Sequence, residues 1–120
     1  MQDKETPNII KKLHSAILYA ADGLKQTFKD EQAFRLECLA VVMALPVLYA
    51  ISASLAEKLL MFLSLMLVLI AELVNTAVEA AIDRISADKH PLAKKAKDVA
   101  SAAVALSVFT AAVIWLVVIF

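Results

Sequence analysis

The chain has 120 residues, of which 62% are hydrophobic, and its mean hydropathy is +0.77. An ordinary soluble domain is roughly 45–50% apolar. The excess lies in three long apolar runs separated by charged segments, which is typical of an integral membrane protein. The 12 basic and 12 acidic residues cancel, which argues against a nucleic-acid-binding protein. The single cysteine, Cys38, excludes an internal disulfide.

The first charged segment predicts an amphipathic helix over residues 8–37. Its apolar residues recur at helical spacing with charged residues between them, which favours a helix lying on the membrane surface. Packing on soluble protein is the alternative, but the chain contains no soluble domain. Gly23 and the cluster 29–31 are the two places where this segment could divide. The apolar positions are Ile10, Leu13, Ile17, Leu24 and Phe28.

Three transmembrane helices are predicted to follow. Residues 38–55 are uncharged and reach the lower part of the ~17–25 residues that a span needs. The second span, 58–85, opens with an apolar run and continues as a helical pattern for roughly 40 Å, more than the ~30 Å hydrocarbon core. A charged connection over 86–98 leads into the third span, 95–120. We therefore expect one all-α membrane domain over residues 1–120.

The distribution of lysine and arginine predicts the orientation. Six lie in residues 1–37, one near residue 57 and five in residues 84–97. The positive-inside rule then places the N-terminus and the 86–98 loop in the cytoplasm, and the C-terminus outward.

A polar stripe on the second span is the first sign of function. Its members follow one another at spacings of three, four and four residues, so they share one side of a helix. An ionised carboxylate in a membrane helix costs about 2.5–3.5 kcal/mol, and the stripe must therefore face protein, metal or a watery cavity. Helix–helix hydrogen bonding is the alternative, but it suits three carboxyl groups poorly. The stripe comprises Glu72, Asn75, Glu79 and Asp83.

A second polar stripe opens the third span: Lys94, Lys97, Asp98 and Ser101. Both stripes lie at the cytoplasmic ends of their spans and are joined by a short loop, so we expect them to converge. Carboxylates together with lysines suit a site for a divalent metal and phosphate oxygens. Lysines snorkelling to the membrane surface are the alternative for Lys94 and Lys95.

Three segments resemble the prokaryotic diacylglycerol kinase family. They match its patterns E-x-A-F-R-x-E, E-x-x-N-[ST]-A-[IV]-E-x-x-[VI]-D and H-x-L-[AS]-x-x-A-K-D. The segments are DEQAFRLE (30–37), AELVNTAVEAAIDRI (71–85) and DKHPLAKKAKDVASAAV (88–104). The resemblance covers essentially the whole chain. It implies a homotrimeric lipid kinase of the bacterial inner membrane that transfers the γ-phosphate of ATP, with Mg²⁺, to diacylglycerol and gives phosphatidic acid.

The resemblance also implies roles for individual residues. Glu72 would be the general base, supported by Asn75, and Glu31 and Glu79 would hold the metal. A surface ion pair with Arg35 is the alternative role for Glu31. Lys12 stands where the family has an arginine. The implied nucleotide contacts are Lys12, Tyr19, Glu31, Glu79, Asp88, Lys89, His90, Lys97 and Asp98. The implied lipid contacts are Lys12, Ala33, Phe34, Arg35, Glu37, Glu72, Ser101 and Trp115.

Two other functions stay open at this point. Undecaprenol kinases share the fold and much of the motifs, although AFRLE, DRIS and the SAAV after the K-D pair favour the diacylglycerol branch. A small ion or proton conductor is the non-enzymatic alternative. A conductor needs polar groups through the full depth of a span, whereas here they stop at the cytoplasmic edge.

Overall fold

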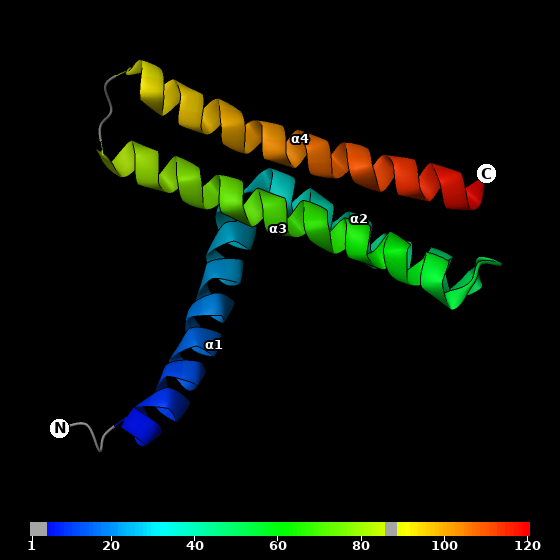
Figure 1. Cartoon of the computed structure of the whole chain (residues 1–120), viewed down its shortest axis with the longest axis horizontal. Helices are drawn as coiled ribbons and strands as arrows, with labels where there is room; N and C mark the ends of the chain where they lie inside the picture. The colour runs from blue at the N-terminus through cyan, green and yellow to red at the C-terminus, as the bar shows by residue number, and fades with distance from the viewer. Residues whose placement is uncertain (1–4, 86–88) are drawn as a thin grey trace. The chain divides into compact units, whose positions relative to one another are not determined.

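The structure, a computed structural model, describes residues 5–85 and 89–120, with side chains from residue 8 onward. The described residues form four helices (Figure 1): α1 (Glu5–Asp30), α2 (Gln32–Ala50), α3 (Leu55–Ile85) and α4 (Pro91–Ile119). The predicted all-α class is confirmed. The chain separates between Gln32 and Ala33 into two compact units, so α1 forms one unit and α2–α4 form the other.

Helices α2, α3 and α4 are each long and apolar enough to cross a membrane, which confirms the three predicted apolar helices. Only 11% to 22% of each apolar window is buried within the chain. Apolar surface left open to water is unfavourable. Most of the surface of these helices must therefore be covered by lipid or by other protein.

The predicted surface helix 8–37 is divided at Glu31. Helix α1 ends at Asp30, and the amide of Glu31 donates to the carbonyl oxygen of Thr27 at 2.8 Å. Residues 32–37 therefore belong to the first apolar helix, which begins six residues earlier than the predicted span and ends at Ala50 rather than at residue 55. The charges of Arg35 and Glu37 moved the predicted start of this helix too far along the chain, because hydropathy alone treats a charged residue as lying outside the membrane.

A capping box starts α3. The amide of Ser54 donates to Glu57 Oε1 at 2.9 Å, and the amide of Glu57 donates to Ser54 Oγ at 3.1 Å. These two bonds satisfy backbone donors that the first helical turn leaves open. Lys58 Nζ also donates to the carbonyl oxygen of Tyr49 at 3.4 Å. Glu57 and Lys58, at the start of the predicted second span, thus belong to the first turn of α3.

Helices α3 and α4 run antiparallel and pack against each other (Figure 1). Small buried residues on α4 let the two backbones approach closely. The buried hydroxyl groups of Ser64 and Ser107 donate to the carbonyl oxygens of Met61 and Val104, each at 2.7 Å, as a membrane interior requires. The buried rows are Met61, Ser64, Val68 and Glu72 on α3, and Ala100, Ser107 and Ala111 on α4.

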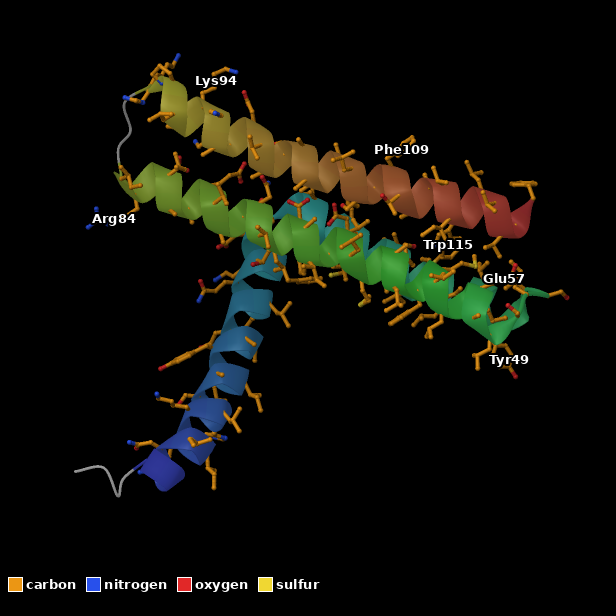
Figure 2. The ribbon with its side chains drawn as sticks, viewed as in Figure 1. Tyr49, Glu57, Arg84, Lys94, Phe109 and Trp115 are labelled. Carbon is orange, nitrogen blue, oxygen red and sulfur yellow. The ribbon has the colours of Figure 1, made fainter. Side chains whose placement is uncertain are left out.

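Trp115 joins the two helices near the end opposite Arg84 and Lys94 (Figure 2). Its indole Nε1–H donates to the carbonyl oxygen of Met61 at 3.1 Å, and the Met61 side chain is fully buried. Replacing Trp115 with phenylalanine keeps an aromatic ring and removes this bond. We expect a loss of about 0.6 kcal/mol in stability, the average for such bonds between membrane helices, seen as a lower melting temperature in detergent.

Phe109 provides the matched control because it is an exposed aromatic residue of α4. Phe109→Leu should leave the melting temperature unchanged. An unchanged melting temperature for Trp115→Phe, together with a changed KM for lipid, would instead support the predicted lipid contact at Trp115.

Candidate active site

Glu72 is a buried carboxyl group in the middle of an apolar helix. Its side chain is 6% exposed, and it continues the buried row of α3 that starts at Met61. It lies 17 residues after Leu55, which is roughly 26 Å along the helix. Glu72 therefore faces protein rather than lipid, as the stripe predicted.

The neighbour of Glu72 is a second carboxyl group, that of Glu37 on α2. The two carboxyl groups lie close enough to interact electrostatically. Two ionised carboxylates in such proximity repel each other, and a bound proton or cation relieves that repulsion. The pair thus places two carboxyl groups side by side in an apolar setting.

The pairing of Glu37 with Glu72 was not predicted from the sequence, where Glu37 appears only as an implied lipid contact. Glu37 lies 13 residues before Ala50, or roughly 20 Å from the end of α2, whereas Glu72 lies roughly 26 Å from the start of α3. Helical rise alone would therefore have placed the two carboxyl groups within roughly 6 Å of each other in depth. The rotation of α2 about its axis could not be obtained in this way.

Three buried polar atoms without a hydrogen-bond partner in the described part of the chain lie on Glu37 and on the turn of α3 that follows Glu72. Among the described residues, Glu37 Oε1, Asn75 Oδ1 and Thr76 Oγ1 have no hydrogen-bond partner. An unsatisfied buried group costs about 1–3 kcal/mol, and native proteins carry few of them. Asn75 and Thr76 both lie within about one turn of Glu72. This concentration of unsatisfied groups suits a place where another polar molecule binds.

The C-terminal end of α3 and the N-terminal end of α4 carry two ion pairs. Lys97 Nζ lies 2.7 Å from Asp83 Oδ1, and Lys94 Nζ lies 2.6 Å from Asp98 Oδ2. The first pair crosses from α4 to α3, so the two predicted polar stripes do converge. All four side chains are partly exposed, and such pairs add little stability. The two ion pairs hold their four charged groups in defined positions at this end of the helices.

Glu79 is the carboxyl group between these two clusters. It is half-buried and lies seven residues, roughly 10 Å, from Glu72 along α3. No three acidic, histidine or cysteine side chains converge within the described part of the chain. Mg²⁺ in kinase sites, however, is usually held by one or two carboxylates together with substrate phosphates and water. Glu79 with a nucleotide fits that requirement.

The predicted nucleotide residues outside this region lie on α1, just after α1 and just before α4. Lys12 and Tyr19 line an open surface groove on α1, and Glu31 follows the last residue of α1. His90 caps α4, where its Nδ1 accepts from the amide of Leu92 at 3.1 Å. Lys89 beside it is exposed. The predicted contact at Asp88 lies outside the described residues.

The predicted lipid residues differ in burial. Phe34 is buried, Arg35 and Trp115 are half-buried, and Ala33 and Ser101 are exposed. The exposed pair are small residues at the starts of α2 and α4, where a lipid could approach them. Phe34 is 3% exposed, so its ring is largely covered by other residues of the chain.

The model of the prokaryotic diacylglycerol kinase family matches residues 18–119. The chain belongs to this family. Curated diacylglycerol kinases are similar along most of their length. The protein from Pseudomonas aeruginosa is 43% identical over 103 residues, which cover 84% of each chain. The protein from Haemophilus influenzae is 38% identical over 97 residues, covering 81% of this chain and 82% of its own.

A more distant member of the diacylglycerol kinase family matches over a longer stretch. The Helicobacter pylori protein is 35% identical over 118 residues, covering 96% of this chain and 92% of its own. The family match confirms the resemblance seen in the three sequence motifs and makes this chain a lipid kinase. All three motifs lie within the matched residues.

Proposed function

We propose that this lipid kinase transfers the γ-phosphate of ATP to the free hydroxyl of diacylglycerol and forms phosphatidic acid. The observation that carries the proposal is the carboxyl group of Glu72, which is 6% exposed within a membrane-spanning helix and has the carboxyl group of Glu37 as a neighbour. A membrane helix retains such a group for a function. The relatives named above are diacylglycerol kinases.

Glu72 acts as the general base. The hydroxyl oxygen of the lipid attacks the γ-phosphorus, the bond from that phosphorus to ADP breaks, and the hydroxyl proton passes to the Glu72 carboxylate. Such a base must lie where the lipid hydroxyl lies, near the membrane surface, and Glu72 is in the half of α3 toward Arg84. Asn75, one turn further, is available to hold the substrate oxygen.

The nucleotide occupies the cytoplasmic end of the site. Phosphoryl transfer depends chiefly on positioning and charge neutralisation. Glu79 and Glu31 hold Mg²⁺, which supplies positive charge to the phosphate oxygens. Lys97 binds a phosphate. The other nucleotide contacts are Asp98, Lys12, Tyr19, Asp88, Lys89 and His90. The proposed lipid contacts remain Ala33, Phe34, Arg35, Glu37, Ser101 and Trp115.

The assembly is proposed to be a homotrimer in the bacterial inner membrane. The large apolar surface left open on α2–α4 leaves room for contact with other copies of the chain. Helix α1 lies on the cytoplasmic surface through exposed residues such as Ile10 and Ile17. The segment 86–98, of which residues 91–98 form the start of α4 rather than the predicted loop, is cytoplasmic and the C-terminus faces outward, following the distribution of lysine and arginine.

Transfer of labelled γ-phosphate in mixed micelles tests the function. Diacylglycerol and undecaprenol are offered side by side with Mg²⁺ and ATP. We expect labelled phosphatidic acid as the main product. Preference for undecaprenol would keep the fold and the site but change the substrate, and transfer to neither lipid by a folded oligomer would refute the proposed reaction.

A further inference from the structure

Asp83 is the one member of the α3 polar stripe that the proposed reaction does not use. Its Oδ1 accepts a hydrogen bond from Lys97 Nζ at 2.7 Å, across the α3–α4 pair. The two side chains remain 67% and 41% exposed, so the pair adds little to stability. Its importance therefore lies in where it holds the ammonium group of Lys97.

Lys97 has a second carboxylate within electrostatic reach, that of Glu79. Glu79 lies four residues before Asp83, about one turn or roughly 6 Å along α3. The flexible four-carbon stem of lysine can cover that distance. Asp98 is not an equivalent partner, because its own carboxylate is held by Lys94 at 2.6 Å and adjacent helical residues do not face each other. The ammonium group of Lys97 can therefore pair with either Asp83 or Glu79.

We propose that Asp83 is a positioning residue that keeps the ammonium group of Lys97 away from Glu79. The Glu79 carboxylate then stays available to a divalent cation, and Lys97 stays available to nucleotide phosphates. This inference rests on the proposed function, which gives Glu79 and Lys97 those tasks. Without Asp83 the ammonium group pairs with Glu79, and the cation has to displace it.

Binding of Mn²⁺ tests the inference without relying on turnover. The full chain in detergent micelles is saturated with β,γ-methylene ATP, and bound Mn²⁺ is measured by electron paramagnetic resonance. Asp83→Asn should raise the Kd for Mn²⁺ about threefold to fivefold, the upper part of the range for exposed ion pairs. Asp83→Glu should restore it. Glu57→Gln, which removes a carboxylate from the far end of α3 and can still cap the helix, should leave it unchanged.

A double-mutant cycle separates the proposed role from two simpler ones. In a Lys97→Met background, Asp83→Asn should have no further effect on the Kd for Mn²⁺, because no ammonium group remains to occupy Glu79. An equal rise in both backgrounds would mean that Asp83 acts through its own charge, and would overturn the inference. A lower melting temperature with an unchanged Kd would mean a purely structural pair and would overturn it as well.

Failure of the proposed function gives a different result. In that case the unaltered chain neither binds Mn²⁺ with the nucleotide analogue nor transfers phosphate, and both conclusions fall. If the unaltered chain does both and Asp83→Asn binds Mn²⁺ equally well, only the positioning role of Asp83 is lost.

Discussion

Replacing Glu72 with glutamine is expected to lower kcat about 10²–10⁴-fold, the usual contribution of a general base. Glutamine fills the same space beside Glu37 but cannot accept the proton of the lipid hydroxyl. The KM values for lipid and ATP should change little, because the change removes an interaction made chiefly in the transition state. The measurement is labelled phosphate transfer in mixed micelles.

The control for this variant is the integrity of the protein. Glu72→Gln should elute from a sizing column with the unaltered chain and melt at the same or a higher temperature, since it removes a buried charge. Glu57→Gln, the same change on the same helix, should keep full activity. A Glu72→Gln protein with more than a tenth of the original kcat would rule out Glu72 as the base.

Removing the carboxyl group of Glu37 should have the second-largest effect. Glu37 is the acidic neighbour of Glu72 on α2, and a hydrogen bond to a charged group contributes about 1.5–3 kcal/mol. If Glu37 donates such a bond and orients the base, Glu37→Leu should lower kcat roughly 10- to 100-fold. Glu37→Gln, which still offers an N–H donor, should stay within a few-fold of the original rate. Turnover at saturating lipid and ATP measures both.

The kcat and the KM for lipid are compared between the two Glu37 variants. Equal and large losses in both would mean that the Glu37 carboxyl group itself takes part in proton transfer. A higher KM for lipid with an unchanged kcat in Glu37→Leu would instead support the lipid contact that the sequence resemblance implied.

The helices themselves were largely predictable from local patterns. Hydropathy predicted the three apolar helices, and the charge cluster at 29–31 marked the division that the structure places at Glu31. The start of α2 was predicted wrongly, because Arg35 and Glu37 look like residues outside the membrane. Glu37 lies within an apolar helix beside another carboxyl group, that of Glu72 on α3. Such a neighbour is invisible to any pattern within α2.

The site was predictable where residues share one helix. Glu72, Asn75, Glu79 and Asp83 follow from helical spacing alone. Partners across helices depend on how each helix is rotated about its axis, which a single sequence does not reveal. The convergence of the two stripes was therefore predicted without naming the residues that meet. The structure shows that Lys97 and Asp83 form this contact, at 2.7 Å. The polar groups at Thr76 and Glu37 were found only from the packing.

Helix α3 runs from Leu55 to Ile85 without a glycine or a proline. On the proposed assignment, the group that activates the lipid and a group that holds the metal both belong to this one uninterrupted helix, roughly 10 Å apart. Helix α3 then holds these two groups at a fixed separation. A substrate is selected by the depth of its hydroxyl in the bilayer. Many soluble kinases exclude water by closing a lid. Here the bilayer itself can keep water away, so no hinge within α3 is needed for catalysis.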